Sequence, residues 1–202
     1  MAGPQPIDFY FEFASPYGYL ASLEIDTLAK KYGRAVNWRP FMLGAAFNIT
    51  NSAPNMTIPM KGAYLYRDVE RCAKLMGVAL TNPEIAPMNS LAAMRAFYWL
   101  SDTNPAQAVA LAKAVYHGHW GEGRDLSPVE AVAEMADSIG VEGAALVVAT
   151  QDLAVKDRLK KETQKAIDRG AFGSPFFFVD DEAYWGHDRL SHIEHQLQNG
   201  GI

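Results

Sequence analysis

The N-terminal part of the chain changes its hydrophobic period twice. Residues 7–13, IDFYFEF, alternate at period two and predict a strand. Residues 16–32 then carry apolar side chains at helical spacing, and Gly33 predicts the end of that helix. Residues 35–41, AVNWRPF, return to a strand pattern that ends near Pro40. A strand, a helix and a strand with short joints predict a right-handed βαβ unit.

The middle of the chain predicts a long loop followed by a block of helices. Residues 42–60 hold two prolines and three asparagines with little periodicity, so we expect a structureless and functional loop. From Lys61 to Gly170 the apolar period is helical. Helices are predicted near residues 61–76, 89–102, 105–119, 127–138, 142–149 and 151–169.

The C-terminal part returns to strands. Residues 176–179 and 182–185 predict a hairpin that turns at Asp180-Asp181, and Asp188 is expected to cap a terminal helix. A βαβ half and a ββα half together predict an α/β fold, a thioredoxin-like four-stranded mixed sheet with an inserted all-helical domain. The expected boundaries are 1–60 and 170–202 for the discontinuous thioredoxin-like domain and 61–169 for the inserted helical domain.

Composition and charge narrow the class of protein. The 202 residues are 49% hydrophobic and 20% charged, which is the balance of a globular protein. Eighteen basic and 23 acidic residues give a net charge of -5 without a basic stripe, which argues against nucleic acid and anionic membranes as partners. No apolar run reaches the ~18 residues of a membrane span. The start, MAGPQP, lacks the features of a secretion signal, so we expect a cytoplasmic protein.

Cysteine and histidine usage argues against two kinds of site. Cys72 is the single cysteine, and its place inside a predicted helix indicates a small core residue. The chain therefore has no intrachain disulfide, no CxxC redox pair and no cysteine-based zinc site, which fits a reducing compartment. The five histidines form one i, i+2 pair and one i, i+3 pair without a clear third ligand, so no metal site is predicted.

Ser15-Pro16 is the first candidate for chemistry. A serine N-cap followed by proline at N1 is an ordinary helix start, and that structural role alone explains both residues. The pair also lies where a predicted strand ends and a helix begins, the place at which open α/β sheets bind ligands. There the helix dipole and the unpaired N–H groups favour an anion, and the Ser15 hydroxyl can donate to a thiolate.

Two segments near the C-terminus are candidates for the same site. Ser174-Pro175 suits a cis X–Pro bond at the start of a strand, which would turn the Ser174 backbone toward a peptide-like ligand; the alternative is an ordinary turn. In the segment WGHDR, residues 185–189, Gly186 permits close backbone approach. Asp188 can meet a ligand ammonium group or act only as a helix cap.

Polar residues of the middle segments are candidates to orient a substrate. They are Asn48, Asn51, Asn55 and Asn89. Asparagine is also common in turns and caps, so each of them has a structural alternative. His119 and Arg124, in the glycine-rich segment HWGEGRD, are further candidates for a pocket wall.

Seven segments taken together resemble the 2-hydroxychromene-2-carboxylate isomerases, relatives of the kappa-class glutathione transferases and of DsbA-like disulfide oxidases. They are DFYFEFASPYGYLA, RPFMLGAAF, YLYRDVERCAKLMGV, NSLAAMRA, GEGRDLS, AIDRGAFGSPFFFV and YWGHDRL, and they follow the family's order over nearly the whole chain. DsbA-like proteins carry Cys-x-x-Cys where this chain has Ser15-Pro16-Tyr17-Gly18. Disulfide exchange on a sulfur of this chain is therefore excluded at that place.

The resemblance implies that the thiol is borrowed from glutathione. It implies that Ser15 holds the glutathione sulfur and that Ser174, beside Pro175, pairs with the tripeptide backbone. The γ-glutamyl end is then expected at Trp185, Gly186, His187 and Asp188. The implied reaction, in aromatic-compound degradation, isomerises a 2-hydroxychromene-2-carboxylate to a trans-o-hydroxybenzylidenepyruvate. The thiolate adds to a conjugated carbon and is expelled after rotation.

One departure from the family affects the substrate end. Family members often have a lysine for the substrate carboxylate where this chain has Asn48, whereas Asn55 keeps the family's asparagine. Lys61 or Arg67 are the alternatives for that charge. The expected ligands are therefore glutathione and a small aromatic substrate, and the resemblance implies a homodimer. Two other functions stay open: a kappa-like glutathione transferase or peroxidase acting on another electrophile, and a binding protein without enzymatic activity in which Ser15 is only a cap.

Overall fold

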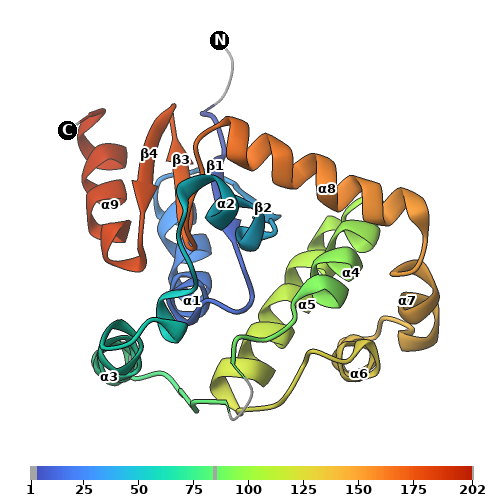
Figure 1. Cartoon of the computed structure of the whole chain (residues 1–202). Helices are drawn as coiled ribbons and strands as arrows, with labels where there is room; N and C mark the ends of the chain where they lie inside the picture. Colours follow the sequence, from blue (N-terminus) through green and yellow to red (C-terminus); the bar gives the residue numbers. More distant parts are fainter. Residues whose placement is uncertain (1–3, 84–85, 202) are drawn as a thin grey trace.

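The strands predicted at the two ends of the chain join in one mixed sheet of order β2-β1-β3-β4 (Figure 1). β1 (Ile7–Phe11) is parallel to β2 (Val36–Pro40) and antiparallel to β3 (Phe176–Val179). β4 (Glu182–Trp185) pairs with β3 through the predicted two-residue hairpin turn. The predicted α/β plan, a thioredoxin-like sheet with helices between its halves, is confirmed.

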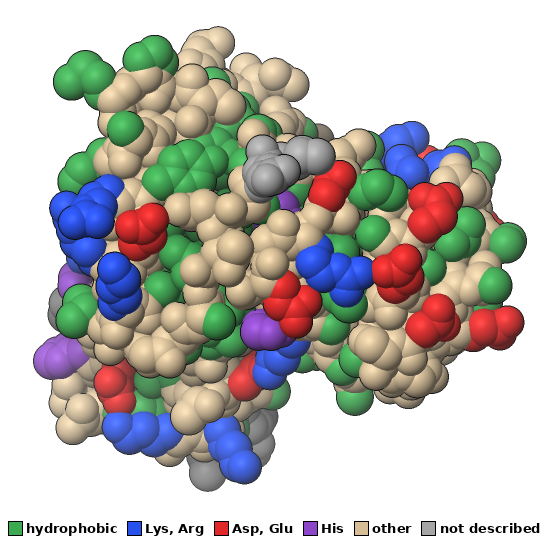
Figure 2. Space-filling view, turned by 90° about the horizontal axis from the view of Figure 1, so that it is seen from below, with side chains coloured by type: hydrophobic (Ala, Val, Ile, Leu, Met, Phe, Trp, Pro, Cys, Tyr) green, Lys and Arg blue, Asp and Glu red, His purple; other side chains and the backbone are tan. Residues whose placement is uncertain are grey.

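The computed structural model describes residues 4–83 and 86–201. The first residues of the MAGPQP start and the last residue of the expected thioredoxin-like domain lie outside that range. Within the described ranges, no helix combines the length and the apolar character needed to cross a membrane, and no three His, Cys, Asp or Glu side chains gather as metal ligands. On the face shown in Figure 2, acidic and basic side chains lie intermixed.

The side chains of β1 alternate between two buried layers. Phe9 and Phe11 lie in a large core that α1 (Pro16–Lys31) and α9 (Leu190–Asn199) share. The phenyl rings of Phe9 and Phe11 stack with centroids 5.1 Å apart, which favours this packing beyond the burial of apolar area. α1 ends before Gly33, whose φ of 66° is the left-handed conformation predicted for a helix stop.

The opposite face of the sheet carries a smaller core. Tyr10 packs there with residues of α2 (Leu43–Thr50) and α8 (Leu153–Asp168). The presence of α2 corrects the prediction of a structureless loop at residues 42–60. Its eight residues, about two turns, are too few for periodicity to distinguish a helix from a loop. Asn51 ends this helix with a φ of 51°, so it acts as a helix stop, and it does not line the cavity described below.

Helices fill the segment between the two halves of the sheet, as predicted. They are α3 (Lys61–Met76), α4 (Leu91–Ser101), α5 (Pro105–Tyr116), α6 (Val129–Ser138) and α7 (Gly143–Ala149), followed by α8. Figure 1 shows α4 to α7 gathered to one side of the sheet. The ring of Phe11 contacts Phe97 of α4 and Tyr116 of α5, so the core runs from the sheet into these helices. The division of the chain into two domains stays a prediction.

Three predicted ends differ from the structure. β1 ends at Phe11, two residues early, because the chain turns there toward α1. α5 passes into the π-helical turn η2 (His117–Gly121). Asp188 does not cap α9: it lies inside the turn η3 (His187–Arg189), and α9 begins after Arg189 without a side-chain cap.

Candidate active site

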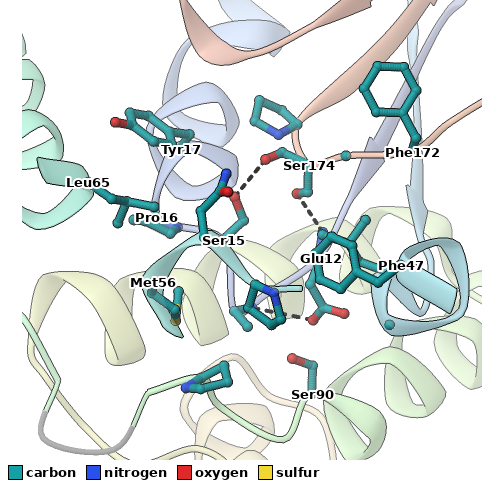
Figure 3. A pocket seen from close by; sticks show the side chains of 18 of the residues that line it. Glu12, Ser15, Pro16, Tyr17, Phe47, Met56, Leu65, Ser90, Phe172 and Ser174 are labelled. Atoms are coloured by element: carbon teal, nitrogen blue, oxygen red, sulfur yellow. Dashed lines mark hydrogen bonds between the residues drawn. The ribbon is translucent and has the colours of Figure 1, made fainter. Parts of the chain in front are cut away.

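A cavity of about 930 Å³ opens at the carboxyl end of β1 (Figure 3). Segments far apart in the sequence form its wall: the β1–α1 junction, α2, the turn η1 (Asn55–Thr57), α3, the start of α4, the loop before β3, and the turn after β4. The carboxyl end of the central parallel strands is where ligands bind in open α/β sheets. Every candidate site residue of the Ser15, Ser174 and WGHD segments lines this cavity.

Ser15 caps α1 and lines the cavity at the same time. Its Oγ accepts a hydrogen bond from the backbone N–H of Gly18 at 3.1 Å, and Pro16 follows at N1. The predicted cap is thus confirmed. The Ser15 hydroxyl in turn donates to the backbone carbonyl of Ser174 at 2.8 Å. The N-terminal end of α1, where the helix dipole favours an anion, therefore faces the cavity.

The Ser174-Pro175 peptide bond is cis, as the sequence suggested. Besides its carbonyl contact with Ser15, Ser174 accepts a hydrogen bond on its Oγ from the backbone N–H of Glu12 at 2.9 Å. The loop before β3 is therefore bound to the β1–α1 junction through both oxygens of Ser174 (Figure 3). Within residues 4–83 and 86–201, the backbone N–H of Ser174 has no acceptor.

Gly18 occupies the place of the second cysteine of a Cys-x-x-Cys motif. A Cβ atom added there would lie 2.5 Å from the hydroxyl oxygen of Tyr116 and 3.0 Å from Oγ of Ser174. Real Cβ atoms essentially never approach a neighbour so closely. The Tyr116 hydroxyl is held there because it donates to the backbone carbonyl of Glu12 at 3.0 Å. Any side chain at this position, not only a thiol, therefore requires the Tyr116 hydroxyl to move from this hydrogen bond.

The WGHD segment forms the opposite rim of the cavity. Gly186 has a φ of 111°, a conformation that only glycine adopts readily. Trp185 is half exposed, and its indole packs on the ring of Phe172 with centroids 4.9 Å apart. His187 contacts the Glu24 carboxylate through Nε2 at 2.8 Å. Asp188 is exposed and forms an ion pair with the adjacent Arg189 at 3.0 Å.

The three predicted substrate asparagines lie on one part of the wall. Asn48 of α2, Asn55 of η1 and Asn89 before α4 all line the cavity. Asn89 also accepts on its Oδ1 from the backbone N–H of Leu91 at 3.3 Å, so it has a local turn role as well. The three asparagines therefore line the same cavity, although Asn48 lies in a helix and not in the predicted loop.

The structure also places five other residues that the sequence analysis named. Lys61 and Arg67 do not line the cavity. His119 is fully buried in the helical block, and Arg124 pairs with Glu134; neither of them lines this cavity. Cys72 is half-buried: it packs against the core, as expected, and it also lines the cavity from α3.

Glu12 is a site residue that the sequence analysis missed. It follows the last residue of β1, lines the cavity, and accepts on Oε1 from the backbone N–H of Ala14 at 3.3 Å. Burial raises the pKa of the Glu12 carboxyl to about 7, against the opposing effect of the Ser90 hydroxyl and nearby backbone amides. The available signal was one acidic residue in the otherwise apolar and aromatic run FYFEFAS.

Tyr17 is a second missed residue. Its hydroxyl donates to Oδ2 of Asp68 on α3 at 2.7 Å, so it ties the first turn of α1 to the helical block. Burial and this hydrogen bond to a carboxylate raise the pKa of the Tyr17 hydroxyl. The neutral phenol therefore stays a donor at the cavity rim.

Comparisons with known proteins agree with this geometry. The family model of the DSBA-like thioredoxin domain matches residues 6–198. The 2-hydroxychromene-2-carboxylate isomerase of Sphingobium xenophagum is 33% identical, over 95% of this chain and 97% of that protein. Glutathione S-transferase kappa 1 of Caenorhabditis elegans is 26% identical, over 95% and 90% respectively. A solved structure of a 2-hydroxychromene-2-carboxylate isomerase matches with a TM-score of 0.86 at 32% identity, over 95% of this chain and 94% of that one.

These matches include both halves of the sheet and the helices between them. They also span the β1–α1 junction, the cis-proline loop and the turn after β4, which together form the cavity. The chain therefore belongs to the 2-hydroxychromene-2-carboxylate isomerase family of DsbA-like thioredoxin-fold proteins.

Proposed function

We propose that this protein is a glutathione-dependent isomerase that converts 2-hydroxychromene-2-carboxylate-type substrates to trans-o-hydroxybenzylidenepyruvate-type products in aromatic-compound degradation. One observation carries the proposal: the Ser15 hydroxyl lies at the N-terminal end of α1, opposite the cis-Pro175 loop, in a cavity that has no redox cysteine pair. The relative from Sphingobium xenophagum is named for this activity, and the match covers 97% of that protein.

The residues at one end of the cavity fit glutathione. The backbone N–H of Ser174 has no acceptor among the described residues and suits a peptide carbonyl, as in strand addition. The backbone at Gly186 leaves no room for a Cβ, which would lie 2.5 Å from Oδ1 of Asp188. The Asp188 carboxylate beyond it suits the ammonium group of a γ-glutamyl residue, with Trp185 and His187 as neighbouring walls.

Bound glutathione would supply the thiolate that makes the substrate double bond rotatable. Ser15 stabilises that thiolate when its hydroxyl turns from the Ser174 carbonyl toward the sulfur. The end of α1 adds the positive end of the helix dipole, and both effects favour the ionised thiol at neutral pH. The freed Ser174 carbonyl is then available as an acceptor for a peptide N–H.

The other end of the cavity fits a small aromatic acid. Phe47, Met56 and Met94 are among its apolar walls, which suit a planar ring. Asn48, Asn55 and Asn89 supply amide donors for the carboxylate and for oxygen atoms on the ring. Among the described residues at this end, no cation lines the wall, which matches the replacement of the family lysine by Asn48.

A kappa-like glutathione transferase or peroxidase is the second candidate. The 26% identity with a kappa-class transferase and the missing cation at the substrate end favour it. The two candidates share glutathione binding and differ in outcome, because a transferase leaves the sulfur attached to its electrophile and an isomerase releases glutathione unchanged.

The test combines calorimetric titration with glutathione and an isomerase assay with 2-hydroxychromene-2-carboxylate. We expect saturable binding and turnover in which glutathione is not consumed. Binding with consumption of glutathione would support the transferase instead. Absence of glutathione binding would contradict both enzymatic candidates and would favour the binding protein in which Ser15 is only a helix cap.

Compartment and assembly are part of the proposal. The use of reduced glutathione and the absence of a disulfide pair fit the cytoplasm. A homodimer is carried over from the family resemblance. Light scattering of the purified protein tests it directly: a mass near 22.2 kDa would be the monomer, and twice that value the dimer.

A further inference from the structure

The backbone of Glu12 is held from both sides, and Oε1 of its carboxylate accepts from the backbone N–H of Ala14 at 3.3 Å. Its N–H donates to Oγ of Ser174 at 2.9 Å, and its carbonyl accepts from the Tyr116 hydroxyl at 3.0 Å and from the backbone N–H of Ser15 at 2.9 Å. Figure 3 shows the carboxylate between Ser174 and Ser90, beside Phe47. Glu12 therefore stands between the expected glutathione end and the substrate end.

The surroundings of Glu12 leave it as the ionisable group of the substrate end. The lining residues that α2 and α4 contribute are uncharged. From α5, Tyr116 faces Glu12, and its pKa is raised by burial and by the Glu12 charge. The other titratable lining residues among those described come from other elements: α1 and α3 carry Tyr17, Asp68 and Cys72, and the turn after β4 carries His187, Asp188 and Arg189.

The proposed substrate needs a proton transfer before its double bond can rotate. In a 2-hydroxychromene-2-carboxylate, carbon 2 carries a hydroxyl and the ring oxygen, so the compound is a cyclic hemiketal. Its alkene gains a conjugated ketone only when the bond between carbon 2 and the ring oxygen breaks. That opening removes a proton from the 2-hydroxyl and adds one to the ring oxygen.

We propose that Glu12 is a catalytic residue that opens the hemiketal ring, a role that rests on the isomerase function proposed above. The neutral carboxyl gives its proton to the ring oxygen while its second oxygen takes the proton of the 2-hydroxyl. The carbon–oxygen ring bond breaks, a ketone and a phenol form, and Glu12 ends as a neutral acid again. One proton moves in each direction, so no further reactant is needed.

The protonation state of Glu12 agrees with this role. With a pKa of about 7, a substantial fraction of Glu12 is neutral at physiological pH, whereas an ordinary glutamate is ionised. A neutral Glu12 also admits the substrate carboxylate, which an ionised one would repel at an end of the cavity without a cation. The chromene turnover rate is therefore expected to fall as pH rises through about 7.

The test compares two substrates in the wild type and in Glu12→Gln. The first is 2-hydroxychromene-2-carboxylate. The second is cis-benzylidenepyruvate, which has no ring hydroxyl, cannot close, and needs no ring opening. We expect Glu12→Gln to lower kcat/KM for the chromene about 100-fold or more and to stay within about threefold of the wild type on the open substrate. Glu182→Gln, which removes an exposed carboxylate on β4, is the matched control.

The outcomes separate the possibilities. Equal loss on both substrates would overturn the role, because Glu12 would then act on the fold or on the thiolate. No loss on the chromene would overturn it as well. A wild type that neither binds glutathione nor turns over the open substrate would remove the proposed function itself, before any variant is considered.

A second variant keeps the test independent of folding losses in Glu12→Gln. Ser90→Ala removes a hydroxyl that opposes the raised pKa of Glu12. It should move the high-pH fall of chromene turnover to higher pH while the carboxyl is retained. If chromene turnover fell at the same pH in the wild type and in Ser90→Ala, the fall would not be caused by ionisation of Glu12.

Discussion

The Ser15 hydroxyl donates to the carbonyl oxygen of Ser174 at 2.8 Å, across 159 residues of sequence. This contact joins a helix cap to the residue before a cis proline, and it makes two ordinary local motifs into one site. It also means that the Ser15 proton already has an acceptor. A bound thiolate must compete with the Ser174 carbonyl for it.

Replacing Ser15 by alanine should change both stability and chemistry. Loss of the cap is expected to cost about 1 kcal/mol of folding free energy. Loss of the hydroxyl donor should raise the pKa of bound glutathione, seen as a smaller thiolate ultraviolet absorbance at neutral pH. Asn104→Ala is the matched control, because Asn104 caps α5 through the Gln107 N–H at 3.2 Å. The control should lose similar stability without any change of thiolate absorbance. An unchanged absorbance in Ser15→Ala would show that Ser15 does not stabilise the thiolate.

Replacing Gly18 by alanine should destabilise the protein by about 1–3 kcal/mol, because the new Cβ overlaps its neighbours. It would lie 2.5 Å from the Tyr116 hydroxyl oxygen. The added variant Tyr116→Phe should recover part of that loss in thermal melts. Gly44→Ala, in α2 with open space around it, should be neutral or stabilising. If Gly18→Ala and Gly44→Ala had the same effect on thermal stability, the space around Gly18 would not be crowded.

Glu12 should make stability fall as pH rises from 4.5 to about 7. Its pKa is about 7 in the folded protein, against an ordinary value of 4.5, so the folded state binds the proton more tightly. The contribution to stability is complete below pH 4.5 and is lost as pH rises through about 7. The loss is at most about 3 kcal/mol. Thermal melts of Glu12→Gln should lack this part of the pH dependence, whereas Glu182→Gln should keep it.

Replacing Asn48 by lysine should restore a cation to the substrate end of the cavity. Its exposed position on α2 tolerates the longer side chain. We expect KM for 2-hydroxychromene-2-carboxylate to fall several-fold while glutathione affinity is unchanged. Ser52→Lys, exposed and outside the cavity lining, is the control for added charge alone. An unchanged KM would place the substrate carboxylate elsewhere.

The sheet, the long helices and three parts of the cavity could be predicted from the sequence. Period-two and period-3.6 patterns are local, and caps such as Ser15-Pro16 have strong residue preferences. The helix α2 could not be predicted, because eight residues give too little periodicity and its N-terminus has no side-chain cap. Glu12 was missed for another reason: its pKa and its direction depend on Ser90, Ser174 and Tyr116, which only the fold brings to it.

The crowded space at Gly18 has a consequence for the chemistry that this helix can carry. A thiol–disulfide oxidoreductase needs two cysteines at the first helix, and here the second place is blocked by a tyrosine hydroxyl that is itself anchored on the chain. Installing a Cys-x-x-Cys motif at this helix therefore takes changes at Ser15 and Gly18 and added room at Tyr116. Ser15→Cys alone gives a solitary thiol, and Gly18→Cys alone gives a steric overlap with the Tyr116 hydroxyl. Single substitutions therefore do not supply this helix with the dithiol of a thiol–disulfide oxidoreductase.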